Sequence, residues 1–322
     1  MRGTSPVAVG AAFAAVVALA GCGTGSADPG GSDTSAYTDG SRVPKVENED
    51  DIPELPLARY EFSDSDTERF TQAQARAAQR CMADFGFTDF PLDPALPGSV
   101  NMVGGAAGML VAVAMPTPFG ELDLDEARRF GYGWDPKAAD GGQVKKARAM
   151  TDAEYRVFYN ADRTPGLTVK GREVPGTGCY GKAATGLTKG VGNTTRMWTY
   201  TSGWAGALAK KALKDPEVSE ALRTWSTCVE DKGSARYEDR EAAFRDKAWH
   251  RGDDGNTPRT QRERDTAVAD IECAREHNTV GEWWAGSARS QTADIASHRA
   301  EYEAVRRDQD VVRASVRRVL RD

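Results

Sequence analysis

Histidine is scarce in this sequence, with three in 322 residues, and basic residues are not in surplus. So few histidines leave little material for histidine-based metal sites or general bases. Lysine and arginine total 42 against 48 aspartate and glutamate residues, which gives a formal net charge of −6. General nucleic-acid binding requires a basic surplus, so this balance argues against nucleic acid as a partner.

Apart from the uncharged segment 98–115, which is considered below, long apolar runs are also missing, with one exception near the start of the chain. Apolar residues make up 39% of the sequence and charged residues 28%, as in a soluble globular protein rather than a multi-span membrane protein. The exception is the uncharged run from Val7 to Ala20, which follows Arg2. This run is too short to span a bilayer, but it has the length of the apolar region of a signal peptide.

The apolar run ends in Leu19-Ala20-Gly21-Cys22, which resembles the lipobox of bacterial lipoprotein precursors. The resemblance implies that a signal peptide, residues 1–21, is removed and that Cys22 receives a diacylglycerol thioether. Two acyl chains are enough for stable anchoring, whereas one is not. We therefore expect a palmitate-type lipid anchor at Cys22, with the bilayer as a partner and the chain on the outer side of the cell membrane. An ordinary secretory signal with a chance cysteine is the alternative.

The stretch that follows the anchor has the composition of a tether. Residues 22–66 are rich in Gly, Ser, Asp and Pro, and they carry eleven acidic residues against three basic ones. Such a segment cannot bury enough apolar surface to offset the entropy lost on ordering. We expect a disordered acidic linker over this range, followed by a first subdomain at 67–200 and a second at 201–322.

Four further cysteines are available for disulfide bonds outside the cell: Cys81, Cys179, Cys228 and Cys273. An even number in an oxidising compartment predicts two disulfides, for which three connectivities are possible. The first and third cysteines each lie five residues before a glycine, Gly86 and Gly233, that would end a helix. If each is followed by its own partner, the pairs are Cys81–Cys179 and Cys228–Cys273, and we favour this connectivity. The cysteines lack the C-x₂-C spacing of metal sites, so we expect no metal and no cofactor.

Helix signals are frequent in the rest of the chain, which predicts a mainly α fold. We expect helices that begin at Asp64–Ser65, at the capping box Thr151–Glu154, at Asp215–Pro216 and at Thr257–Pro258. A long stretch without Pro or Gly, 289–321, predicts one or two amphipathic helices.

The middle of the chain, residues 91–201, is rich in Gly and Pro, and we expect it to be largely irregular. Residues 172–174 and 197–200 are candidates for short strands. Residues 176–183 lack the hydroxyl of a phosphate-binding loop, and we interpret them as a Gly-rich disulfide loop. The uncharged segment 98–115 is expected to be a covered loop, and a hairpin that dips into the membrane is the alternative.

A family resemblance rests on a set of short motifs in order along the chain. They are Cys81-Met82, Gly86-Phe87, Arg129-Phe130-Gly131-Tyr132, Gly178-Cys179, Trp225, Cys228-Val229, and Asp270 with Cys273. Together with the lipobox, this pattern resembles uncharacterised actinobacterial lipoproteins with largely helical ectodomains. The resemblance covers most of residues 67–275, and it implies a disulfide-stapled helical ectodomain but no activity.

Motifs for catalysis are missing from the sequence, and tryptophan supplies the candidate binding residues instead. There is no G-x-S-x-G or H-E-x-x-H motif, so we expect no catalytic residues and no enzyme. Exposed aromatic side chains can anchor a ligand, and a possible binding surface is formed by Trp198, Trp204, Trp283 and Trp284. The sequence favours a binding or scaffold module whose partner is an envelope protein or a wall polymer. The alternative is a wall-modifying hydrolase that uses an unrecognised carboxylate pair.

Overall fold

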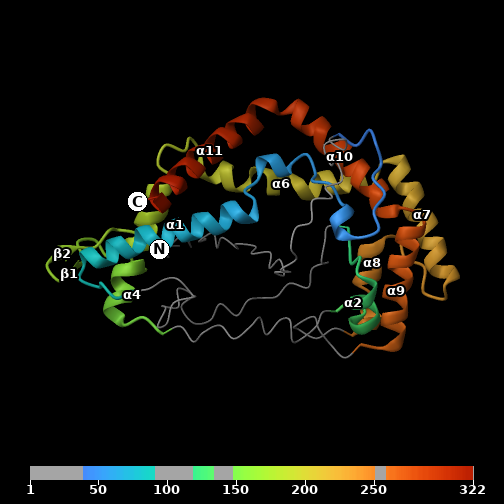
Figure 1. The fold of residues 1–322 in the computed structure, drawn as a ribbon, viewed down its shortest axis with the longest axis horizontal. Coiled ribbons are helices and arrows are strands. Elements are labelled where there is room, and N and C mark those ends of the chain that lie inside the picture. The colour runs from blue at the N-terminus through green and yellow to red at the C-terminus, as the bar shows by residue number, and fades with distance from the viewer. Residues whose placement is uncertain (1–38, 91–118, 134–147, 251–258, 322) are drawn as a thin grey trace, which may run out of the picture. The chain divides into compact units, whose positions relative to one another are not determined.

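The computed structural model describes residues 39–90, 119–133, 148–250 and 259–321, and helices dominate these ranges (Figure 1). The prediction of a mainly α fold is therefore confirmed. The longer helices are α1 (Asp64–Asp84), α5 (Gly178–Leu187), α6 (Thr194–Ala212), α7 (Pro216–Asp231), α9 (Gln261–Glu276), α10 (Thr279–Ser297) and α11 (Arg299–Arg321). The shorter ones are α2 (Leu124–Phe130), α4 (Asp152–Tyr159), α8 (Arg240–Phe244) and the 3₁₀ turns η2 (Glu49–Asp51), η3 (Ala58–Tyr60) and η4 (Lys247–Trp249). Two short strands, β1 (Thr168–Val169) and β2 (Arg172–Glu173), pair in antiparallel register.

Several helix ends lie where the sequence predicts them, because their caps are local. The Thr151 side chain accepts a hydrogen bond from the backbone of Glu154, and the Glu154 carboxylate accepts one in return. The Asp215 side chain caps α7 by accepting from the backbone N–H of Glu217, with Pro216 as the first helical residue. Gly86 and Gly233 both follow helix ends with positive φ, at 76° and 91°. A cap depends on residues within one turn, so sequence alone can place it.

Other local predictions are wrong. Residues 197–200 lie inside α6 rather than in a strand, since Asn193 caps this helix and the buried residues Met197 and Thr201 follow helical spacing. The helix expected from residue 257 begins at Gln261, capped by Thr260. The expected Gly-rich loop is the first turn of α5. Its Gly178 has a φ of 66°, and a side-chain carbon there would lie 2.3 Å from the carbonyl oxygen of Phe158.

The expected disordered linker is wrong for residues 39–66. Val46, Leu57 and Tyr60 are buried, and this segment packs along α10. Trp284 Nε1 donates to the carbonyl of Pro53 at 2.7 Å, and the Gln291 side chain accepts from the backbone of Leu57 at 3.0 Å. A polar segment can be held in place by a few apolar residues when these are buried against the surface of a helix, because their burial is favourable. The rest of the linker, the signal peptide, Cys22 and the segment 98–115 lie outside the described residues.

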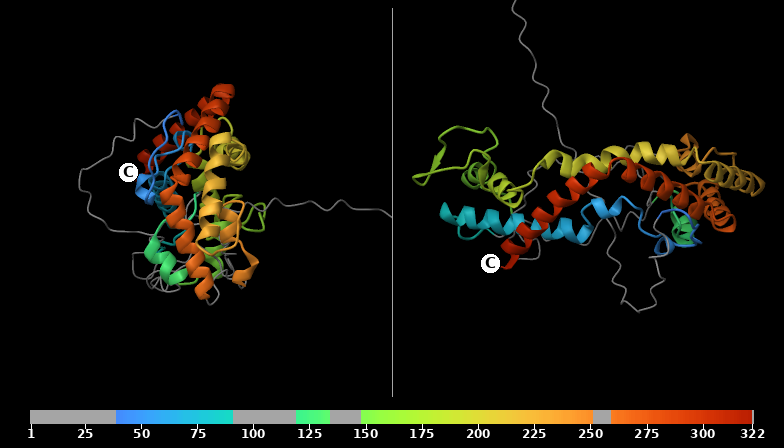
Figure 2. Two further views of the ribbon diagram at one scale, coloured as in Figure 1. Left: turned by 90° about the vertical axis from the view of Figure 1, so that its right-hand side faces the viewer. Right: turned by 90° about the horizontal axis from the view of Figure 1, so that it is seen from above.

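The expected boundary between residues 200 and 201 is also wrong, because it falls inside α6. Thr34–Asp322 clusters as one compact unit. Within it, α11 packs against both α1 and α6 and lies between them (Figure 2), while α10 packs against α6, α7 and α9. The long helices therefore connect groups of residues that the sequence analysis assigned to separate subdomains.

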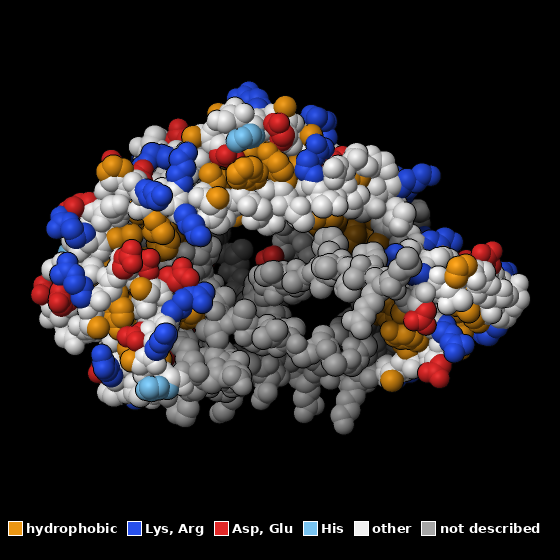
Figure 3. Space-filling view, turned by 180° about the vertical axis from the view of Figure 1, so that it is seen from behind, with side chains coloured by type: hydrophobic (Ala, Val, Ile, Leu, Met, Phe, Trp, Pro, Cys, Tyr) orange, Lys and Arg blue, Asp and Glu red, His pale blue; other side chains and the backbone are white. Residues whose placement is uncertain are grey.

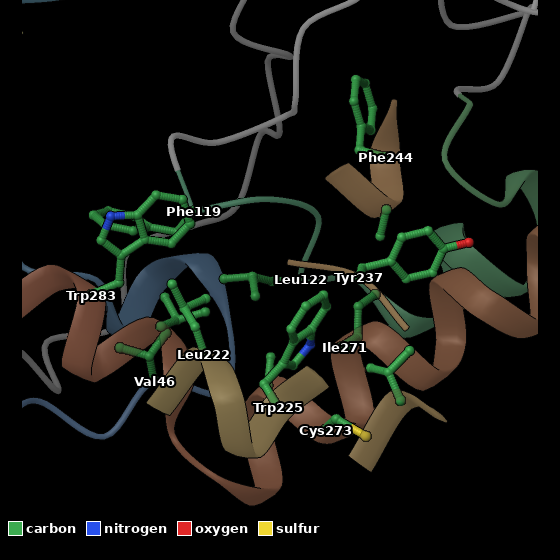
Figure 4. Close-up of a cluster of buried hydrophobic side chains, with 14 of the residues drawn as sticks. Val46, Phe119, Leu122, Leu222, Trp225, Tyr237, Phe244, Ile271, Cys273 and Trp283 are labelled. Atoms are coloured by element: carbon green, nitrogen blue, oxygen red, sulfur yellow. The ribbon is translucent and has the colours of Figure 1, made fainter. Parts of the chain in front are cut away.

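The largest hydrophobic cluster is formed by α7, α9 and α10 with the shorter helices α2 and α8. Trp225 lies at the middle of this cluster, with Leu222, Leu122 and Ile271 around it (Figure 4). A second cluster joins α1, α4 and α5, and two smaller ones lie along α11. The helices α1, α6, α10 and α11 contribute to more than one cluster, so each of these four is held at more than one place along its length.

The favoured disulfide connectivity is confirmed. Cys81 in α1 bonds to Cys179 in α5, with their Cα atoms 5.5 Å apart. Cys228 in α7 bonds to Cys273 in α9, with their Cα atoms 5.8 Å apart. Each disulfide lies within one of the two larger clusters, so the covalent link and the apolar packing join the same helices.

One buried carboxylate, that of Glu154, makes the stability of the α4 region dependent on pH. Arg148 donates to both carboxylate oxygens of Glu154, at 2.7 and 2.8 Å, and this lowers the pKa of Glu154 from 4.5 to about 2. Because the pKa of Glu154 is lower in the folded chain than in the unfolded chain, its ionised carboxylate stabilises the fold at pH values above about 4.5. This stabilisation is lost as the pH falls from about 4.5 to about 2.

We expect Glu154→Gln to lower the free energy of unfolding by about 2 kcal/mol at neutral pH, because a hydrogen-bonded charge pair is lost. The difference from the unsubstituted protein should shrink as the pH falls below 4.5. Urea unfolding followed by circular dichroism over this pH range measures it. Glu241→Gln is the control, because the Glu241 side chain is 53% exposed and its pair with Arg245 contributes little. A difference that stays constant with pH would contradict the role given to Glu154.

Candidate functional site

The four predicted binding tryptophans fall into two groups in the structure. Trp198 and Trp204, both in α6, are 41% and 39% exposed, whereas Trp283 and Trp284 in α10 are 7% and 0% exposed. The prediction that the adjacent pair Trp283–Trp284 contributes to a binding surface is therefore wrong.

The adjacent tryptophans are both buried because α10 is covered on more than one side. The Trp283 ring meets Phe119 edge to face, with ring centroids 5.7 Å apart. Trp284 points toward the segment before α1 and donates its indole N–H to Pro53. A helix covered on a single side could not bury both side chains, since consecutive residues point about 100° apart.

Trp198 is partly exposed, but its ring has a packing role. Its centroid lies 4.7 Å from that of Phe62 and 5.5 Å from that of Phe70. Both phenylalanines belong to the start of α1 or the residues before it. Trp198 therefore packs where α6 contacts α1 and the residues before it. Its exposed part is the outer edge of a side chain that is used for packing.

Trp204 has a different environment, in which its contacts orient the ring and leave it exposed. The His298 ring stacks against it, with centroids 5.7 Å apart and planes 23° apart. Burial raises the pKa of the Tyr200 hydroxyl, and a hydrogen bond from Trp204 opposes this shift. Tyr200 lies one helical turn before Trp204, so the two side chains lie on the same face of α6.

The partners of Trp204 are themselves joined through Asp294, near the end of α10. One Asp294 oxygen accepts a hydrogen bond from the Tyr302 hydroxyl at 2.7 Å, and the other lies 3.2 Å from His298 Nδ1. The Tyr302 ring in turn meets Tyr200 edge to face, with centroids 5.0 Å apart. These contacts form a closed ring from Trp204 through Tyr200, Tyr302, Asp294 and His298 back to Trp204. We call this group the Trp204 platform.

A shallow depression of about 450 Å³ lies next to the platform. It is lined by Asn193, Thr195, Arg196, Thr199, Tyr200, Gly203 and Trp204. Figure 3 shows one face of the molecule on which hydrophobic side chains gather beside a histidine. The volume lies within the range of ligand sites, and the lining combines aromatic surface with hydroxyl, amide and guanidinium groups.

The motif residues of the sequence analysis meet at a second place, which is enclosed. Asp270 accepts hydrogen bonds from Arg240 at 2.5 Å, from the Trp225 indole at 3.1 Å and from the Tyr132 hydroxyl at 3.2 Å. Arg240 also donates to the carbonyls of Phe119 and Glu121. Burial raises the pKa of Asp270, and the Arg240 charge opposes this shift. Asp270 and Arg240 are fully buried, so this centre holds α7, α8 and α9 together and gives a ligand no access.

The carboxylates that precede α2 line a depression of about 680 Å³. The Asp123 side chain accepts from the backbone N–H groups of Asp125 and Glu126, as expected of residues that cap a helix. Burial raises the pKa of Glu121, but its carboxylate is held by the N–H groups of Leu122 and Asp123. These carboxylates are therefore committed to local backbone structure.

Cys228, Glu276 and His277 also lie close together, within 4.8 Å of one another. Cys228 is bonded to Cys273, so it has no thiolate to offer a metal ion. Among the described residues, no helix is both long and apolar enough to cross a bilayer. No protein family model, curated protein or solved structure matches this chain.

Proposed function

We propose that this chain is a lipoprotein, anchored to the outer side of the cell membrane through Cys22, whose helical unit binds an envelope partner through the Trp204 platform. The observation that carries the binding role is the platform itself. A large aromatic side chain remains 39% exposed while four other residues hold it in a closed ring of contacts. Side chains already fixed before binding lose little entropy on binding, which is typical of residues that anchor a partner.

The anchor is supported by the Leu19–Cys22 motif and the apolar run before it. The two disulfides agree with export, because such bonds persist in oxidising compartments. The alternative, a hydrolase with a carboxylate pair, has less support. Glu121, whose pKa is raised by burial in the depression before α2, already accepts two backbone hydrogen bonds, and Asp270, whose pKa is also raised, is fully buried.

In-cell photo-cross-linking tests the proposal. The photoreactive residue benzoylphenylalanine replaces Trp204 in one variant and Tyr155 in a control variant, since Tyr155 is 43% exposed in α4. We expect a discrete cross-linked product from position 204 and none from position 155. A third variant, Cys22→Ser, should lose palmitate labelling and the position-204 product together, because an unanchored chain leaves the membrane fraction. Equal products from both positions, or none from position 204, would contradict the binding role.

A further inference from the structure

We infer that the ligand of the Trp204 platform is a neutral oligosaccharide, one of whose sugar rings stacks on the Trp204 indole. This inference rests on the proposed function and specifies the chemistry of the partner. It is carried by the orientation of the indole, by the polar groups around it and by a glycine beside it.

The indole is oriented for stacking. His298 lies against the Trp204 ring with only 23° between the two planes, and Tyr200 accepts the indole N–H. Contacts to a face and to an edge leave indole surface exposed, as the 39% exposure of this residue requires. The C–H groups of a pyranose ring make one sugar face apolar, and a flat aromatic face is complementary to it.

The polar side chains around the indole favour a hydroxyl-rich ligand without charge. Asn193, Thr195 and Thr199 line the depression, and none of them is ionisable. Arg196 also lines it, but its guanidinium pairs with Asp308 at 3.5 Å. Positive charge in the depression is therefore compensated. An anionic ligand would find no net attraction. The Asn193 side-chain oxygen already accepts from the Arg196 backbone, and the Thr199 hydroxyl donates to the Thr195 carbonyl. The Asn193 amide N–H groups can still donate to sugar hydroxyls, and the Thr199 oxygen can accept from them.

Gly203 lines the depression beside Trp204, and its lack of a side chain leaves space there for a ligand. A side-chain carbon at Gly203 would meet nothing within 4 Å, so the packing of the chain does not require glycine there. Glycine inside a helix is unfavourable relative to alanine. Gly206 also has open space around it, but it does not line the depression. The pair offers a matched comparison, because the same substitution at 203 fills the ligand space and at 206 does not.

The test uses the full chain in a detergent without sugar head groups. The probes are triacetylchitotriose, cellotriose and mannotriose as neutral trisaccharides, and trigalacturonate as an anionic one. Saturation-transfer NMR detects contact, and isothermal titration measures affinity. We expect at least one neutral probe to bind more tightly than trigalacturonate. Trp204→Ala and Gly203→Leu should each weaken that binding about tenfold or more, and Gly206→Leu should leave it unchanged.

Thermal unfolding of the three variants separates binding from folding. Gly203→Leu should not lower the melting temperature, because it replaces a helix glycine with a better helix former in open space. The inference is overturned if no neutral probe binds, if trigalacturonate binds best, or if Gly203→Leu binds as well as Gly206→Leu. A protein cross-linked from position 204, with no sugar bound, would overturn the sugar but leave the proposed function standing. If no cross-linked product formed and no sugar bound, both the proposed function and the inference would be contradicted.

Discussion

Replacing Cys81 and Cys179 together with alanine should lower the free energy of unfolding by about 4–5 kcal/mol. The disulfide closes a loop with a sequence separation of 98 residues, and the chain-entropy model assigns a loop of this size about 4.7 kcal/mol. The cluster around the bond holds α1 against α4 and α5. Chemical unfolding monitored by circular dichroism measures the loss.

The second disulfide provides an internal comparison. Cys228–Cys273 has a sequence separation of 45, for which the same model gives about 4 kcal/mol. This disulfide lies in the largest cluster, so its helices keep more apolar packing when it is removed. Hydrogen exchange should show loss of protection in α4 and α5 for the first double variant, and in α7 and α9 for the second. If both variants lost protection in the same helices, the two disulfides would not act on separate regions.

Arg240→Met should lower the free energy of unfolding by about 3–5 kcal/mol, because it leaves the buried Asp270 carboxylate without its charged partner. The carbonyls of Phe119 and Glu121 lose a donor at the same time. Urea unfolding at neutral pH measures this loss. The control is Arg245→Met, just after α8, since the Arg245 side chain is 61% exposed and its loss should change stability by less than about 1 kcal/mol.

A double variant distinguishes the charge from the packing. Arg240→Met combined with Asp270→Leu removes both charges, and apolar replacements of buried ion pairs recover much of the lost stability. We expect the double variant to be more stable than Arg240→Met alone. If the two substitutions were simply additive, the ion pair would not be the reason for the loss.

The candidate site was predicted in part. The sequence indicates Trp198 and Trp204 as candidate binding residues, although it predicts a strand rather than a helix at residues 197–200. It assigns neither Tyr200 nor His298 to a site. A signal was present, since Tyr200 lies four residues before Trp204 and Asp294 four residues before His298. What brings the two pairs together is the packing of α10 and α11 against α6, and no local pattern encodes that.

Arg240 shows the same limit in the core. It lies 30 residues before Asp270, within a run of charged residues that resembles an exposed surface. Its burial follows from the carbonyls and the carboxylate that surround it in the folded chain. Burial of Trp283 beside Trp284 was missed for a related reason, because both sides of α10 are covered by segments distant in the sequence.

By itself, the sequence determined the helical class and several helix caps, because these depend on neighbours within a few turns. It favoured one of three cysteine connectivities, and the structure decided for that one. Only the tertiary structure decided that residues 39–66 pack on α10, that α6 continues through residue 200, and that one exposed tryptophan is oriented by four other side chains. Those outcomes depend on which helix surfaces pack against each other. This packing is determined by the burial of many residues that are far apart in the chain, so no single segment of the sequence encodes it.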